Sequence, residues 1–147
     1  MSPVVFDTSI YIPFYRREAY AAIIERHERR LQTRLCSVVL QELYAGARSK
    51  RAKRQLDEVN RLYTRQGFLV TPTHEDWVSA GVLVERYTRV HGRIKPRDHL
   101  NDLLILLCAA RIGAAVATQN VGDYERWQTM LRKQRQSCTV WDLSQSQ

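Results

Sequence analysis

The stretch Val4-Val5-Phe6-Asp7-Thr8-Ser9 joins a short apolar run directly to an acidic residue. Consecutive valine and phenylalanine residues favour a buried strand. In an open parallel sheet, ligands bind just beyond the carboxyl ends of the strands. Asp7 stands at such an end, where a carboxylate is well placed to hold a metal ion.

Three more acidic residues occupy comparable positions. Glu42 follows a second apolar run in a helical segment, Asp102 lies in the first turn of a long apolar segment, and Asp123 comes soon after Ala115-Val116-Ala117-Thr118. Several carboxylates within a few ångströms repel one another unless a cation lies between them. Mg²⁺ or Mn²⁺ meets this need because both prefer oxygen ligands. The pattern therefore predicts a metal site at one edge of a sheet.

Short apolar segments alternate with segments that are typical of helices. We expect strands over residues 4–6, 35–37, 68–70, 115–118 and 139–141. We expect helices over residues 18–31, 39–48, 49–65, 73–90 and 98–112, with Thr73 and Asp98 as N-caps of the last two. The alternation predicts a three-layer α/β/α domain with a central parallel sheet of about five strands. Right-handed crossovers then bring the carboxyl ends of the strands to one edge.

The length and composition are those of a single cytoplasmic domain. The chain has 147 residues, which we assign to one domain over residues 1–143 and a polar tail over residues 144–147. Its longest apolar run, residues 103–110, is shorter than the roughly 20 residues that cross a bilayer, and no secretory signal is visible. Cys36, Cys108 and Cys138 have apolar neighbours and no metal-ligand spacing, so we expect buried, reduced thiols.

The charge balance points to a polyanionic partner. Lys and Arg number 23 against 15 Asp and Glu, which gives a net charge of +8. A basic surface attracts polyanions, although each single cluster of bases is more often a solvated helix face. The acids also have structural explanations: Glu42 as a solvated edge residue, Asp102 as a favourable charge near a helix start, and Asp123 as a surface loop residue. The histidines show no ligand spacing, and the tryptophans are explained by packing.

Four motifs in order resemble PIN-domain ribonucleases, most of all the VapC toxins of bacterial toxin–antitoxin pairs. The motifs are Val5-Phe6-Asp7-Thr8-Ser9, Gln41-Glu42-Leu43-Tyr44-Ala45-Gly46, Asn101-Asp102-Leu103-Leu104-Ile105 and Ala117-Thr118-Gln119-Asn120-Val121-Gly122-Asp123-Tyr124. The resemblance implies a Mg²⁺-dependent endoribonuclease acting on RNA, a cognate antitoxin that covers the site, and a homodimer.

The resemblance also assigns roles to residues. Asp7, Glu42 and Asp102 match the acidic ligands, and Asp123 matches a more variable fourth acid. Ser9, Thr118 and Asn120 match polar residues that line such sites. The segment Gly122-Asp123-Tyr124 departs from the family, which often has a charged residue and Phe there. This departure leaves the fourth ligand open between Asp123 and Asn120.

Two alternatives and one surface remain as expectations. The chain is alternatively a housekeeping RNA-processing nuclease of the same fold, or a PIN-like module that binds RNA without cleaving it. Basic residues near the first two motifs are expected to line a groove that leads RNA to the acids. These residues are Arg16, Arg17, Lys50, Arg51 and Arg54.

Overall fold

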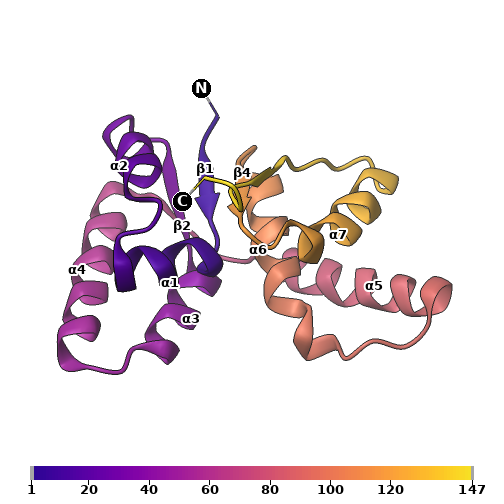
Figure 1. The fold of residues 1–147 in the computed structure, drawn as a ribbon. Helices are drawn as coiled ribbons and strands as arrows, with labels where there is room; N and C mark the ends of the chain where they lie inside the picture. Colours follow the sequence, from indigo (N-terminus) through magenta and orange to yellow (C-terminus); the bar gives the residue numbers. More distant parts are fainter. Residues whose placement is uncertain (1, 147) are drawn as a thin grey trace.

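A computed structural model describes residues 2–146 and contains one five-stranded parallel sheet between helices (Figure 1). The strands are β1 (Val4–Phe6), β2 (Thr33–Cys36), β3 (Leu69–Val70), β4 (Ala115–Thr118) and β5 (Val140–Asp142). Their order in the sheet is β3-β2-β1-β4-β5, and every neighbouring pair is parallel. The expected α/β fold and the number of strands are therefore confirmed.

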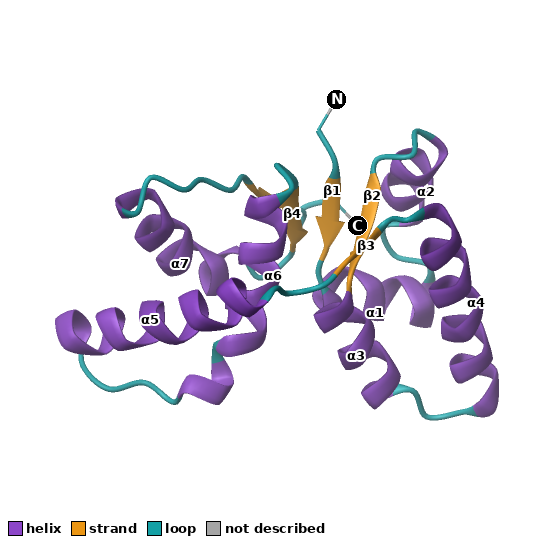
Figure 2. Ribbon diagram, turned by 180° about the vertical axis from the view of Figure 1, so that it is seen from behind, coloured by secondary structure: helices purple, strands orange, loops and turns teal. Residues whose placement is uncertain are grey.

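Helices cover both sides of this sheet (Figure 2). They are α1 (Thr8–Arg17), α2 (Ala21–Arg29), α3 (Ser37–Gly46), α4 (Lys50–Gln66), α5 (His74–His91), the 3₁₀ helix η1 (Pro96–Asp98), α6 (Leu100–Arg111) and α7 (Val121–Lys133). Helices α1 to α4 gather beside β2, and α5 to α7 gather beside β4. The α3–α4 and α5–α6 pairs both extend past the carboxyl ends of the strands, so they flank the edge where the motifs meet.

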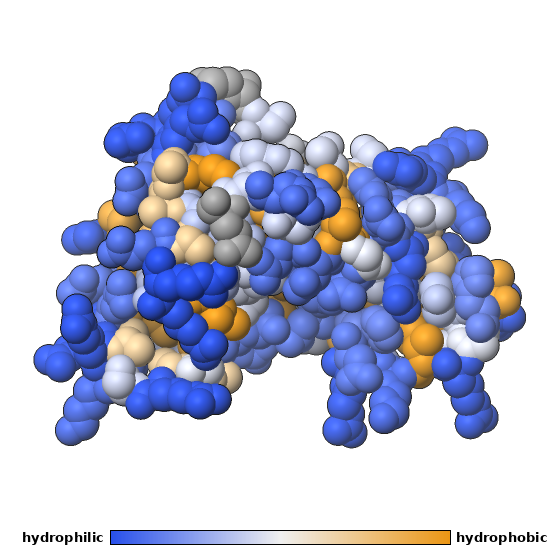
Figure 3. Space-filling view, viewed as in Figure 1, coloured by the Kyte–Doolittle hydropathy of each residue, from blue (hydrophilic) through white to orange (hydrophobic). Residues whose placement is uncertain are grey.

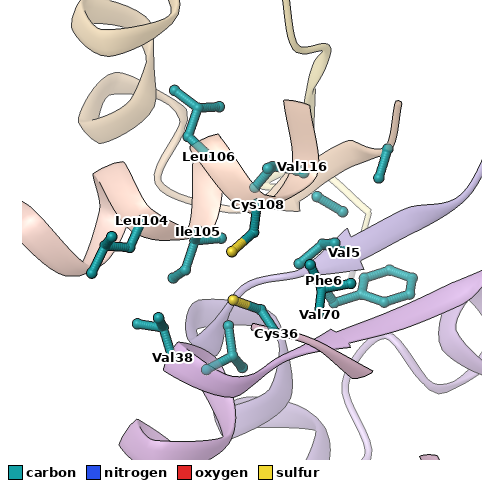
Figure 4. Packing of buried hydrophobic residues seen from close by; sticks show 14 of the residues in the cluster. Val5, Phe6, Cys36, Val38, Val70, Leu104, Ile105, Leu106, Cys108 and Val116 are labelled. Carbon is teal, nitrogen blue, oxygen red and sulfur yellow. The ribbon is translucent and has the colours of Figure 1, made fainter. Parts of the chain in front are cut away.

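The core forms because β1 and α6 are apolar on all sides. The three residues of β1 are buried, and so is every residue of α6 from Leu103 to Ala109. Figure 4 shows the sulfur atoms of Cys36 and Cys108 facing one another between β2 and α6. Both thiols are free and buried, as is Cys138, which confirms the expectation for the three cysteines. Strand β1 is consequently fixed at the centre of the molecule, and Asp7 follows it directly.

The start of α5 is closed by a capping box. The Thr73 hydroxyl accepts a hydrogen bond from the Asp76 amide at 3.1 Å, and the Asp76 carboxylate accepts one from the Thr73 amide at 2.9 Å. The Asp76 carboxylate also pairs with the Arg111 guanidinium at 3.2 Å. These contacts confirm Thr73 as an N-cap and join α5 to the end of α6.

The structure corrects several expected elements. The helix expected over residues 18–31 begins only at Ala21, because Glu18 and Tyr20 adopt positive φ angles of 58° and 63° and turn the chain. Helices α1 and α7 were not anticipated. The assignment of Asp98 as N-cap of α6 is wrong: Asp98 lies inside η1, and the N-cap position is held by His99 without a side-chain hydrogen bond. Pro96 starts this 3₁₀ turn, which delays the α-helix.

The surface is largely polar. Figure 3 shows hydrophilic side chains over most of the face seen in Figure 1, including both projecting helix pairs. Among residues 2–146, no helix has the length and apolar character needed to span a membrane.

A candidate acidic site at the carboxyl edge of the sheet

Asp7 is buried at the end of β1 and its carboxylate is held on both oxygens. It is the N-cap of α1, where its Oδ1 accepts hydrogen bonds from the Ser9 amide at 2.7 Å and the Ser9 hydroxyl at 2.5 Å. Its Oδ2 accepts a hydrogen bond from the Thr118 hydroxyl at 2.9 Å. Burial raises the pKa of Asp7, while the donors on Ser9 and Thr118 oppose this rise. The donors fix the direction in which the carboxylate points.

Ser9 and Thr118 connect the start of α1 to the segment that follows β4. The Ser9 hydroxyl accepts a hydrogen bond from the Gln119 amide at 3.2 Å, and the Thr118 hydroxyl accepts one from the Asn120 amide at 2.9 Å. The two hydroxyl oxygens lie 3.2 Å apart. Both side chains therefore stand at the rim, as expected, whereas Asn120 is exposed and takes part through its backbone.

Glu42 reaches the same rim from α3. Its Oε1 accepts a hydrogen bond from the Thr8 hydroxyl at 2.8 Å, and its side chain is partly buried. This contact crosses from the first turn of α1 to the middle of α3, which pack against one another. Glu42 is thus directed toward the end of β1. It is therefore not a purely solvated edge residue.

Asp102 shows most clearly that the acids converge. It lies in the first turn of α6 and is partly buried. Burial, followed by the negative charges of Asp7, Asp123 and Glu42, raises the pKa of Asp102 to about 7. Carboxylates influence one another in this way only at short range in a poorly hydrated place. Four acids that are distant in sequence therefore form one electrostatic cluster.

Asp123 and Tyr124 approach this cluster together from the first turn of α7. Asp123 is exposed, and its charge still acts on Asp102. Tyr124 is buried, and its hydroxyl interacts with Asp7 and Asp102 without forming a well-shaped hydrogen bond. Burial and the negative charges of these acids raise the pKa of Tyr124 well above its ordinary value. The sequence analysis assigned no role to Tyr124. Its one unusual feature in the sequence is that it stands where the family often has Phe.

Of the five basic residues that were expected to line an RNA groove, Arg16 lines a groove between α1, α3 and α4. The groove has a volume of about 280 Å³ and is lined by Ile12, Arg16, Glu42, Gly46, Arg48 and Leu56, among others. Because Glu42 and Arg16 share this lining, the groove extends to the acidic cluster. Arg51 lines a neighbouring hollow with Tyr15, while Arg17, Lys50 and Arg54 are exposed on α1 and α4. Arg48 was not anticipated.

The side chains suit a divalent cation in their chemistry. Their oxygens are the hard donors that Mg²⁺ and Mn²⁺ prefer. Within residues 2–146, no three acidic, histidine or cysteine side chains lie close enough together to coordinate one ion without moving. Burial and the neighbouring negative charges raise the pKa of Asp102, and a bound cation would offset both, so the donor set fits such an ion in its chemistry.

The fold and the acidic cluster define a small three-layer α/β protein with carboxylates gathered at the carboxyl ends of its strands. The chain belongs to the PIN domain family, whose model matches residues 4–125. Proteins with this domain are generally nucleases. No curated protein matches the chain.

Solved structures share the whole fold. DNA-bound VapBC from Salmonella typhimurium is 22% identical, with 97% of this chain and 98% of that chain covered and a TM-score of 0.68. VapBC-1 from nontypeable Haemophilus influenzae is 17% identical, with 97% and 98% covered and a TM-score of 0.67. FitAcB from Neisseria gonorrhoeae is 15% identical, with 97% and 99% covered and a TM-score of 0.66. These likenesses confirm the three-layer fold over nearly the full chain.

Proposed function

We propose that this protein is a metal-dependent endoribonuclease and the toxin of a toxin–antitoxin pair. The observation that carries the proposal is the convergence of Asp7, Glu42, Asp102 and Asp123: burial, followed by the charges of the other three acids, raises the pKa of Asp102 to about 7. Membership of the PIN family and the likeness to VapBC structures support the same function. Both the basic surface and the acidic cluster suit cleavage of a polyanion.

In the proposed mechanism, Asp7 and Asp102 would hold the cation, and Glu42 and Asp123 would complete its surroundings. Ser9 and Thr118 keep the Asp7 carboxylate directed into the site through hydrogen bonds at 2.5 to 2.9 Å. When bound, Mg²⁺ supplies an activated water and neutralises charge on the phosphodiester. Asp102 must be ionised to bind the cation, so binding releases a proton in solutions near or below pH 7.

RNA is proposed to reach the acids through the groove between α1, α3 and α4. Arg16 and Arg48 line this groove together with Glu42, so their guanidinium groups are available to contact RNA phosphates beside the cluster. Lys50, Arg51 and Arg54 extend the basic surface along the first turns of α4. Phosphate contacts of this kind position the substrate and do not select its sequence.

A cognate antitoxin and a second copy of the chain are the proposed protein partners. The VapBC and FitAcB structures that share the fold support the proposed antitoxin, which would cover the acidic cluster. The proposed homodimer uses helices on the outer side of the sheet. On α5, Trp77 and Val78 are 57% and 51% exposed, which provides apolar surface for such a contact. A cytoplasmic location accords with this proposed function.

RNA cleavage in EDTA and in Mg²⁺ tests the proposed activity. The wild type is expected to lose cleavage in excess EDTA and to regain it in Mg²⁺. Asp102→Asn should lower cleavage by on the order of 10²-fold or more, because asparagine keeps the shape of the side chain and removes its negative charge. Asp98→Asn is the matched control, since Asp98 is exposed in η1, and it should cleave like the wild type. Full activity in EDTA would contradict the mechanism.

The same assays separate the alternatives. An RNA-binding module without catalysis would bind RNA and show no cleavage in Mg²⁺ or Mn²⁺. A housekeeping RNA-processing nuclease would cleave RNA but would not slow the growth of a bacterial host when expressed alone. Growth arrest by the wild type, together with normal growth of cells that express Asp7→Ala at the same level, is the outcome expected of a toxin.

A further inference from the structure

Two buried thiols from distant parts of the chain face one another inside the molecule. Cys36 ends β2 and is the N-cap of α3, and Cys108 lies in α6. They are 72 positions apart in the sequence, and both side chains are buried and free. Figure 4 shows their sulfur atoms pointing toward one another between β2 and α6. Because α3 and α6 also contact one another, the fold itself holds the two thiols together.

A strip of polar groups at the surface lies directly over this thiol pair. The Arg111 guanidinium donates to the Cys108 sulfur at 3.9 Å and, through the same nitrogen, to the Thr71 carbonyl at 2.8 Å. The Thr71 hydroxyl lies 2.7 Å from the hydroxyl of Ser37, the residue that follows Cys36. The Arg111 side chain is 39% exposed, so it contacts both solvent and a thiol. Movement of this one side chain gives a small oxidant access to the sulfur atoms.

The surroundings of the two sulfur atoms give them different reactivity. Cys36 stands at the N-terminus of a ten-residue helix, where the helix dipole favours a thiolate. The Cys108 thiol and the amides of Val38 and Val39 lower the pKa of Cys36, against burial, which raises it. The neighbouring Cys36 and burial raise the pKa of Cys108. Cys36 is therefore the thiol that ionises first, and Cys108 is placed to react with its oxidised form.

We propose that Cys36 and Cys108 form a redox-sensitive pair, which hydrogen peroxide converts to an intramolecular disulfide that ties α3 to α6. In a reducing compartment such a bond is transient, as it is in redox-sensing proteins. The inference is independent of the proposed function, because it requires neither a metal ion nor RNA.

The oxidation takes place in two steps. The Cys36 thiolate attacks one oxygen of the peroxide, the O–O bond breaks, and the hydroxide that leaves takes up a proton to become water. The Cys108 sulfur then attacks the sulfur of the Cys36 sulfenic acid, and the S–O bond breaks. The departing hydroxyl group leaves with the Cys108 proton as a second water. The two thiols lose two electrons in all, and these electrons reduce one peroxide molecule to two water molecules.

The disulfide would join two helices that carry members of the acidic cluster. Glu42 comes six residues after Cys36, and Asp102 comes six residues before Cys108. Each thiol is therefore less than two helical turns from an acid on its own helix. Closing so long a loop also restricts the unfolded chain. Oxidation is accordingly expected to raise the melting temperature by roughly 5–15 °C, and dithiothreitol should reverse this rise.

Peroxide treatment of the folded chain in EDTA, followed by alkylation and non-reducing peptide mass spectrometry, tests the proposal. We expect one cross-linked pair of peptides, which contains Cys36 and Cys108 and is lighter than the two free peptides by two hydrogen atoms. Cys138 should remain alkylated. In Cys108→Ser, which lacks the second thiol, Cys36 should stop at the sulfenic acid, and dimedone should label it.

Cys138→Ser is the matched control. Cys138 is also buried, but its thiol donates to the Ala114 carbonyl at 3.4 Å, and it precedes β5 at the far edge of the sheet from β2. This variant should form the same cross-link as the wild type and show the same rise in melting temperature.

The mapped cross-link is read on the wild type, so the result does not depend on whether a variant folds. Three free thiols in the folded chain, under conditions that oxidise the chain unfolded in guanidinium, would reject the proposal. A cross-link that includes Cys138, or sulfinic acid at Cys36 without a cross-link, would reject it as well. A linked chain that melts no higher than the reduced chain would overturn the inferred restraint of α3 against α6.

Discussion

Replacing Asp102 with asparagine is expected to stabilise the cation-free protein above pH 7 and to leave its stability nearly unchanged at pH 4. In the folded protein, burial and the charges of Asp7, Asp123 and Glu42 raise the pKa of Asp102 from 3.8 to about 7. The folded state therefore holds this proton more tightly than the unfolded state. The contribution of Asp102 to the free energy of unfolding is therefore greatest below pH 4, falls as the pH rises toward 7, and is constant above that. Asparagine resembles the protonated side chain and does not pay this cost.

The size of the effect follows from the same rise in pKa. A difference of one in pKa corresponds to about 1.4 kcal/mol, so a fully shielded carboxyl would lose about 4 kcal/mol between pH 4 and pH 8. Asp102 is only partly buried, and solvent screens part of its interaction with the other acids. We therefore expect about 2 kcal/mol. For a domain of this size, that amounts to roughly 4–8 °C in the melting temperature.

Thermal unfolding of the wild type and Asp102→Asn in EDTA, at pH 4 and at pH 8, measures this difference. Asp98→Asn is the control, because Asp98 is exposed in η1, and it should follow the wild type at both pH values. Added Mg²⁺ should reverse the order at pH 8, since the wild type gains stability by binding the ion. A gap between wild type and Asp102→Asn that is the same at both pH values would refute the account of a charged, crowded carboxylate.

Other predictions concern RNA, the capping box and the proposed toxicity. RNA binding by Asp7→Ala should weaken by roughly 10³-fold between 50 and 200 mM salt if about six phosphates are contacted, and a flat response would reject the basic groove. Charge reversal at Lys50, Arg51 and Arg54 should weaken RNA binding and leave Mn²⁺ affinity unchanged; loss of antitoxin binding alone would assign this surface to the partner. Thr73→Ala should lower the free energy of unfolding by about 1 kcal/mol without changing cleavage below the melting temperature, and a change in kcat would show that the capping box influences the site. Expression of the wild type alone should slow bacterial growth, whereas equal toxicity of Asp7→Ala at the same protein level would argue against nuclease action as its cause.

The fold could be predicted because its strands are read from local patterns. Short apolar runs at β1 and β4 are buried in any parallel sheet that is covered on both faces, so the chain itself indicates where they lie. The parallel arrangement then places Asp7, which follows β1, and Thr118, which ends β4, at one edge. Their hydrogen bond of 2.9 Å confirms that inference directly. Thr73 was equally local, since a capping box involves residues only three apart.

The features that were missed depend on distant or competing interactions. Ile10, Ile12 and Pro13 disfavour a helix by composition, yet α1 forms because Asp7 caps it and Ile10 packs into the core. The break after α1 depends on left-handed residues that are not glycine. Tyr124 acquires its surroundings from β1 and α6, which lie far from it in sequence. Neighbouring residues do not encode such an environment.

The central position of β1 has a consequence for the time at which the site can exist. Val5 pairs with Arg34 of β2 on one side and with Val116 of β4 on the other, so the sheet closes only after β4 has been made. Asp7 and Glu42 emerge early in synthesis, and Asp123 emerges 81 residues after Glu42. At 5–20 residues per second, this interval is roughly 4–16 s. Long-range pairing is also the slow part of folding. A growing chain therefore carries half of the acidic cluster for seconds without a site, and the cluster can be complete only once Asp123 has been synthesised.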